Sequence, residues 1–194
     1  ALFIGDSVTL GFRNSGYIPA KNIIAEKNIN LNELVANKAC YQGKTKTLYD
    51  MIAAQMPNPK KIYIMLGLNN LPGTENADSM NYYKKFLTTM QEKFPGSMIF
   101  VETVSPMMAD SDYTKSFSQA KIDDFNARLL ELAKEMGVYY LNLQEVLKDA
   151  NGYLISDYAS PDGLHMVKAG HEVMYRYFCT HTVQPDGYTD QIVK

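Results

Sequence analysis

The chain is predicted to adopt an α/β fold in which a mostly parallel sheet of about five strands carries helices on both faces. Two observations indicate this class. Short apolar runs of strand length alternate along the chain with longer segments whose apolar residues recur at helical spacing. No internal repeat, low-complexity tract or linker divides the sequence. We therefore expect one domain over residues 1–181, followed by a polar surface tail over residues 182–194.

The predicted strands are short apolar runs of the kind that buried strands of a parallel sheet show. The clearest is Ile62-Tyr63-Ile64-Met65-Leu66, and the weakest is Leu34-Val35-Ala36. The full set comprises residues 2–4, 34–36, 61–66, 98–104 and 138–141.

The predicted helices carry apolar residues three or four positions apart, which places them on one face. In residues 45–56 this face holds Leu48, Ile52 and Met56, and Pro57 follows as a stop signal. The full set comprises residues 18–26, 45–56, 78–94, 118–136 and 168–179.

Composition excludes some partners. The net charge of −2 and the pI near 5.9 argue against a nucleic acid bound through its phosphates. No apolar stretch is long enough to span a bilayer. Cys40 and Cys179 fit either one disulfide or two thiols, and the size of the domain favours thiols. The chain opens on its first predicted strand, which leaves open a leader or another domain before it.

Polar residues follow three of the predicted strands. Ser7 follows the first strand, Gly67-Leu68-Asn69-Asn70 follows residues 61–66, and Ser105-Pro106 follows residues 98–104. Ligands of parallel α/β sheets bind outside the carboxyl ends of the strands, so we expect these residues to share a site.

The chain contains the three residue types that catalysis by a serine nucleophile requires. A serine becomes a nucleophile when a base takes its proton and a third group orients the base. Ser7 is the candidate nucleophile, His165 the candidate base, and Asp162, three residues before His165, the candidate orienting acid. We expect Asp6 to accept loop N–H groups rather than to act in catalysis. Among the other histidines, His171 is expected to be structural and His181 solvated.

Three other chemistries fit the sequence less well than this one. Asp162, His165 and His171 could ligate zinc, but their spacing matches no usual metal motif. Cys40 as nucleophile would lack a histidine in a matching position. Gly5-Asp6-Ser7 also lacks the later glycines of a dinucleotide-binding motif. We therefore expect neither metal nor cofactor.

Four sequence blocks resemble those of the SGNH hydrolases, also called GDSL-type esterases and lipases. They occur in the family's order: Gly5-Asp6-Ser7-Val8, residues 37–45 with Gly43, Gly67-Leu68-Asn69-Asn70, and Asp162-Gly163-Leu164-His165. Val8 stands where the family's name-giving motif has Leu, and Asn70 where Asp is common. The resemblance implies a flavodoxin-like three-layer α/β/α sandwich.

The resemblance also implies an activity and an oxyanion hole. It implies a metal-free serine esterase that hydrolyses short acyl esters, such as O-acetyl groups on carbohydrate. The N–H groups of Ser7 and Gly43 and the side-chain amide of Asn69 would bind the oxyanion. An O-acyltransferase of cell-wall or other glycans and a non-catalytic carbohydrate-binding module are the alternatives. Family analogy implies a location outside the cytoplasm. We also expect residues 105–116, which follow a predicted strand, to shape the pocket.

Overall fold

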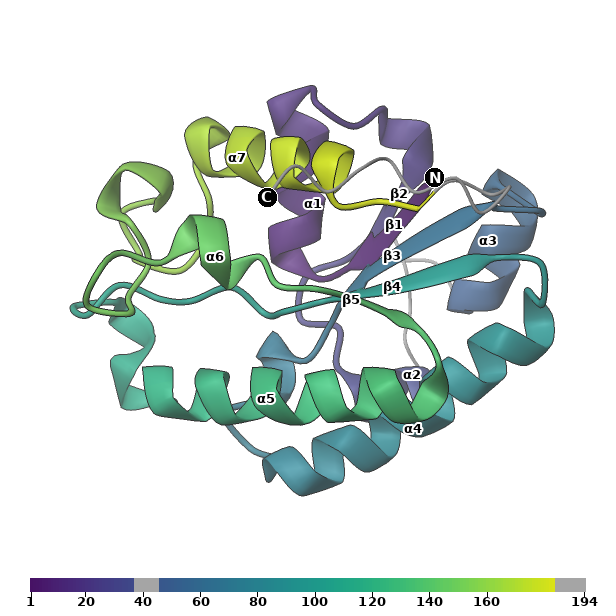
Figure 1. Ribbon diagram of the computed structural model, residues 1–194, viewed down its shortest axis with the longest axis horizontal. Coiled ribbons are helices and arrows are strands. Elements are labelled where there is room, and N and C mark those ends of the chain that lie inside the picture. The colour runs from purple at the N-terminus through teal and green to yellow at the C-terminus, as the bar shows by residue number, and fades with distance from the viewer. Residues whose placement is uncertain (37–45, 184–194) are drawn as a thin grey trace.

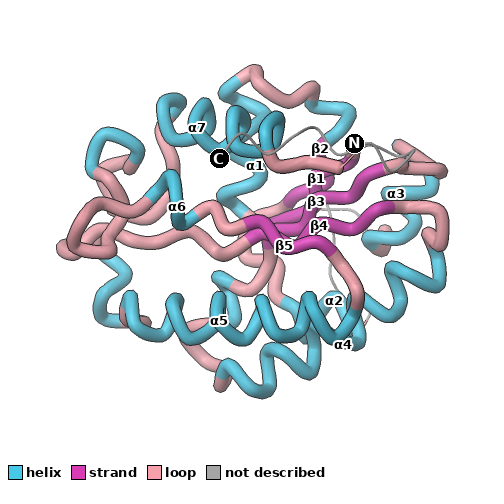
Figure 2. The backbone as a smooth tube through the Cα atoms, in the orientation of Figure 1, coloured by secondary structure: helices cyan, strands magenta, loops and turns pink. Residues whose placement is uncertain are grey.

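A computed structural model describes residues 1–36 and 46–183. In this part of the chain five strands form one sheet with the order β2-β1-β3-β4-β5, and every neighbouring pair is parallel. Figure 2 shows the sheet at the centre of the molecule. The strands are β1 (Leu2–Gly5), β2 (Ile23–Ala25), β3 (Lys61–Met65), β4 (Met98–Glu102) and β5 (Tyr139–Leu141). The predicted sheet is thus confirmed.

The helices cover both faces of the sheet, which confirms the three-layer α/β/α sandwich (Figure 1). One layer contains α1 (Ser7–Ser15), α6 (Gln144–Leu147) and α7 (Lys168–Thr180). The opposite layer contains α2 (Leu31–Val35), α4 (Asn76–Lys93) and α5 (Gln119–Met136). Helix α3 (Leu48–Gln55) packs beside the edge strand β2.

The strand register builds an aromatic row across the face that α7 covers. Phe3 pairs with Tyr63, Tyr63 with Phe100, and Phe100 with Tyr139, so the four rings lie side by side. Successive ring centroids are 4.7, 4.7 and 4.8 Å apart. Phe178 of α7 packs onto the row, with its ring centroid 5.4 Å from that of Phe3. Stacked aromatic pairs add to the area they bury, so this row fixes α7 against the sheet.

The predictions for residues 18–36 are wrong. The second strand is Ile23–Ala25 rather than 34–36, and it lies inside the segment predicted as a helix. Residues 34–36 instead end α2, whose first turn is capped because the Asn30 side chain accepts the N–H of Glu33. A three-residue strand is too short to show a period, whereas an asparagine before a helix is a readable start signal.

Candidate active site

Ser7 is placed by an abrupt change from strand to helix. β1 ends at Gly5, and Ser7 is the first residue of α1. Asp6 caps the helix, because its Oδ1 accepts the N–H of Val8 at 3.0 Å. The structural role of Asp6 is thus as expected, and the Ser7 hydroxyl remains available for another partner. That partner is His165, whose Nε2 lies 2.9 Å from Ser7 Oγ.

Asp162 and His165 share a tight turn. The Nδ1 of His165 lies 2.5 Å from Asp162 Oδ2, so one imidazole contacts both the serine and the carboxylate. Ser160 closes the turn, with its N–H donating to the carbonyl of His165 at 2.7 Å. Three residues that the sequence predicted therefore meet, although Ser7 and His165 are 158 positions apart.

The Asp162 carboxylate receives several hydrogen bonds. Its Oδ1 accepts the Ser160 hydroxyl at 2.6 Å and the N–H groups of Leu164 and His165, each at 3.0 Å. Burial alone would raise the pKa of Asp162, but the bonds from Ser160, from the His165 ring and from these N–H groups hold it well below its usual range. Asp162 is therefore ionised. Sequence reasoning missed Ser160, whose only signal is its position two residues before the acid.

The segment after β4 holds this turn from outside. Met108 N–H donates to the carbonyl of Gly163 at 2.8 Å, and the Ser111 hydroxyl donates to the carbonyl of Asp162 at 2.9 Å. Gly163 has a φ of +72°, and a Cβ there would lie 2.8 Å from Ser111 Cα. Glycine is therefore required at this position both for its backbone conformation and for the close approach of Ser111.

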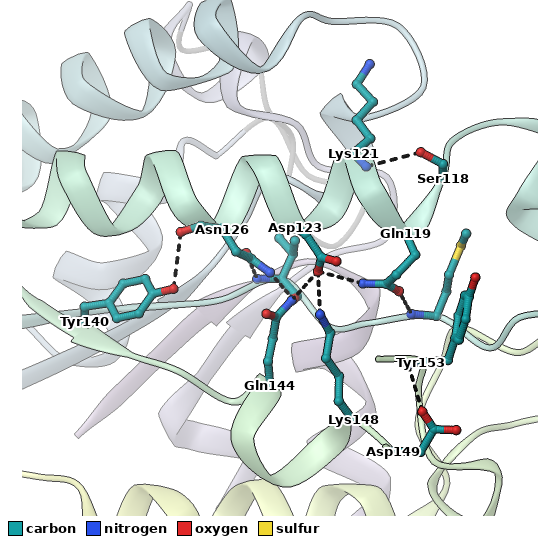
Figure 3. Close-up of polar contacts among 12 residues, drawn as sticks. Ser118, Gln119, Lys121, Asp123, Asn126, Tyr140, Gln144, Lys148, Asp149 and Tyr153 are labelled. Carbon is teal, nitrogen blue, oxygen red and sulfur yellow. Dashed lines mark hydrogen bonds and ion pairs between the residues drawn. The ribbon is translucent and has the colours of Figure 1, made fainter. Parts of the chain in front are cut away.

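Helix α5 in turn holds the start of that segment, as Figure 3 shows for the side chains of Gln119, Asp123 and Asn126. The Asn126 amide bonds both the N–H and the carbonyl of Val104, at 2.9 and 3.0 Å. Gln119 Oε1 accepts the N–H of Met107 at 2.9 Å, and its Nε2 donates to Asp123 at 3.0 Å. Helix α5 thus holds the start of the segment, and the same segment, further along, holds the turn that contains Asp162.

The two asparagines after β3 have different surroundings. Asn69 Nδ2 donates to the carbonyl of Ile29 at 3.0 Å and lies 3.4 Å from Asp6 Oδ2. Asn70 is buried, and its Oδ1 accepts the N–H of Leu31 at 2.9 Å. Asn70 therefore braces the first turn of α2, and Asn69 lies beside the acid that precedes Ser7. Gly43, the third residue predicted for the oxyanion hole, lies outside the described residues.

A cavity of about 490 Å³ opens over these groups. Ser7, Asn69 and His165 line it, together with Tyr113 from the segment that was expected to shape the pocket. The remaining lining residues of the described chain are Lys27, Asn28, Leu68, Pro72, Ser116, Phe117 and Leu164. A volume of this size suits a small-molecule ligand.

The other histidines point elsewhere. His171 is buried, with its Nε2 3.4 Å from the carbonyl of Val8, and burial lowers its pKa. His181 was expected to be solvated, but its ring stacks on that of Tyr177, with the two ring centroids 3.8 Å apart. Cys179 is a free, exposed thiol, while Cys40 lies outside the described residues. Within residues 1–36 and 46–183, no three His, Cys, Asp or Glu side chains form a group that could hold a metal ion.

Two buried carboxyl groups lie beneath the site. Burial raises the pKa of Asp6 to about 6, against the opposing effects of the Val8 N–H and of His165. Burial and the neighbouring Asp6 raise the pKa of Glu102, the last residue of β4, to about 8. Glu102 is therefore a neutral acid at pH 7.

No helix of the described chain combines the length and apolar character needed to cross a membrane.

Comparison with known proteins places the chain in a family. The profile of the GDSL-like Lipase/Acylhydrolase family matches residues 3–173, so the chain belongs to this family of hydrolases. The resemblance to SGNH hydrolases is thus confirmed. No curated protein matches the chain.

Solved structures of low sequence identity share the fold. A protein from Streptococcus pneumonia is 22% identical, with a TM-score of 0.72 over 92% of this chain and 81% of its own. A GDSL-like lipase from Bacteroides thetaiotaomicron is 15% identical, with a TM-score of 0.70 over 92% and 84%. The acetyl xylan esterase AlAXEase is 13% identical, with a TM-score of 0.68 over 94% and 98%.

Proposed function

We propose that the protein is a serine esterase that hydrolyses short acyl esters through Ser7, His165 and Asp162. The observation that carries this proposal is the unbroken contact from Ser7 Oγ to His165 Nε2 and from His165 Nδ1 to Asp162 Oδ2. This is the arrangement in which a base activates a serine and an ionised acid orients the base. Membership in a family of acylhydrolases supports the same reaction.

The reaction has two halves. Ser7 Oγ attacks the ester carbonyl while His165 Nε2 accepts the serine proton, and a tetrahedral intermediate forms. The intermediate collapses to an acyl-enzyme as His165 returns that proton to the leaving alkoxide. Water then attacks the acyl-enzyme with His165 again as base, and release of the carboxylic acid restores Ser7. Asp162 remains ionised and accepts the Nδ1–H bond throughout.

The oxyanion requires donors that face the position where negative charge develops. The N–H of Ser7 is the first of α1, where a helix leaves N–H groups without internal acceptors. Asn69 Nδ2 would be the second donor, exchanging its 3.4 Å contact with Asp6 for the oxyanion. The N–H of Gly43 would be the third, on the basis of the family resemblance.

The substrate proposed here is a small acyl ester, with O-acetyl groups on carbohydrate as the leading class. The lining mixes polar groups with the apolar Leu68, Phe117 and Leu164, which suits a short acyl chain beside a polar alcohol. The shared fold of AlAXEase, an acetyl xylan esterase, adds an analogy.

The test compares the wild type with Ser7→Ala on p-nitrophenyl acetate, butyrate and octanoate. We expect wild-type turnover that falls with chain length and a loss of about 10⁴-fold or more in the variant. A fluorophosphonate probe should label the wild type and not the variant. Equal turnover in both proteins, or a wild type that neither turns over esters nor reacts with the probe, would contradict the proposal.

A further inference from the structure

The charges around the cavity are unequal. Among the described residues that line it, Lys27 is the only lysine or arginine, and none is an aspartate or glutamate. No ion pair joins the Lys27 ammonium group to another residue of the described chain. The ionised Asp162 contacts His165 but does not line the cavity. An ammonium group at the rim of a cavity whose described lining holds no carboxylate attracts anions.

The loop that carries Lys27 is fastened to the site at both ends. On one side, the N–H of Glu26 donates to the carbonyl of Gly5, two residues before Ser7, at 3.3 Å. On the other side, the carbonyl of Ile29 accepts Asn69 Nδ2 at 3.0 Å. Only Lys27 and Asn28 separate these anchors, so the tip of the loop has a fixed relation to the proposed nucleophile and to Asn69.

The backbone at the tip is held in an uncommon conformation. Asn28 has a φ of +61°, and it is the one non-glycine residue with positive φ in the described chain. Both Asn28 and Lys27 are exposed, yet both line the cavity. Asparagine tolerates the left-handed region better than most residues, and such conformations cluster at ligand-binding sites.

We propose that the ester bound in this cavity carries a negative charge and that Lys27 binds it, an inference that rests on the proposed esterase function. The charged group is a carboxylate or a comparable anion, located either in the acyl part or in the alcohol part. If the anion is in the acyl part, the substrate is a half-ester of a dicarboxylic acid. If it is in the alcohol part, the substrate is an acylated acidic sugar or an acylated hydroxy acid. The exposed ammonium group selects the anionic ester and attracts it during encounter.

The test uses two matched pairs of esters. 4-Nitrophenyl hemisuccinate against 4-nitrophenyl acetate places the charge in the acyl part, and 4-acetoxybenzoate against its methyl ester places it in the alcohol part. For each pair, kcat/KM of the anionic ester is divided by that of the neutral ester. Intrinsic reactivity then cancels when this ratio is compared between variants.

We expect Lys27→Ala to lower the ratio about fivefold for one pair, mainly through KM, and Lys27→Glu to lower it further. Added NaCl should raise the wild-type KM for the anionic ester and have less effect in Lys27→Ala. Lys85→Glu, at an exposed position on α4 outside the cavity, makes the same charge change and should keep the wild-type ratio. The pair that responds identifies the charged part of the substrate.

Equal ratios for the wild type, Lys27→Ala and Lys27→Glu in both pairs would overturn the proposal while leaving the esterase function standing. Absence of wild-type turnover with all four esters would overturn the esterase function, and the role of Lys27 with it.

Discussion

Glu102 is a carboxylic acid at the buried end of a strand, and its replacement by glutamine should change how stability depends on pH. Glu102 is only 3% exposed. Burial, together with the nearby Asp6, raises the pKa of its carboxyl group from 4.5 to about 8. Below pH 4.5 the group is protonated in both the folded and the unfolded chain. As pH rises toward 8, the unfolded chain releases this proton and the folded chain keeps it.

The sign and the size of the effect follow from this difference. Because the folded state binds more protons, the free energy of unfolding falls as pH rises through the window from 4.5 to about 8. A tenfold change in proton affinity corresponds to about 1.4 kcal/mol, so the contribution of Glu102 that is lost by pH 9 is on the order of 5 kcal/mol. Glutamine has nearly the same shape and does not ionise, so Glu102→Gln removes this loss.

The assay is thermal unfolding of the wild type and Glu102→Gln at pH 5, 7 and 9, followed by circular dichroism. We expect the variant to gain stability relative to the wild type as pH rises, with a Tm difference of about 10 °C at pH 9. Asp6 titrates in both proteins, so the part of its contribution that does not depend on Glu102 cancels in the comparison. Glu92→Gln, at an exposed position on α4, should follow the wild type. A stability difference that is the same at pH 5 and pH 9 would refute the reasoning.

Two further predictions concern the proposed catalytic groups. Ser160→Ala should lower kcat about tenfold and lower Tm by a few degrees, because it removes a hydrogen bond to an ionised, partly exposed carboxylate. Ser160→Thr should restore both. Adding Ser160→Ala to Asp162→Ala should cost nothing more, and an additive loss would contradict a role exerted through Asp162. Asn69→Ala should lower kcat about 10²–10³-fold with little change in KM. Asn70→Ala should mainly lower Tm, and the reverse pattern for the two asparagines would exchange their assigned roles.

The layers and most elements of the fold could be predicted because their signals are local. Residues 61–66 form a continuous apolar run, and β3 is found there; residues 118–136 have a sustained helical period, and α5 is found there. Helix α1 was missed, although its cap Asp6 and the left-handed Gly16 after it were readable signals. The edge strand β2 has three residues, and no periodicity can be recognised in so short a segment.

The meeting of Ser7 with His165 could be predicted because few residue types perform this chemistry and because the motifs around both residues resemble those of the SGNH hydrolases. The surroundings of these residues could not be predicted from the sequence. The contact of Ser111 with Asp162 depends on how closely two loops approach, and a serine in a loop carries no signal of that distance. The burial of Glu102 had a signal that went unused, namely a charged residue within a run otherwise predicted to be a buried strand.

The turn that holds Asp162 and His165 has little regular structure of its own, since the β-type pairing within it is a single bridge between Ala159 and Met166. Hydrogen bonds within the turn set its local shape, and contacts with its neighbours position it in the fold. The segment after β4 bonds the turn through Met108 and Ser111, and α5 bonds the start of that segment through Asn126. The motif at Asp162 and His165 can be recognised in the sequence because chemistry restricts it. Its orientation toward Ser7 is a property of packing in the second half of the chain, which no short motif encodes.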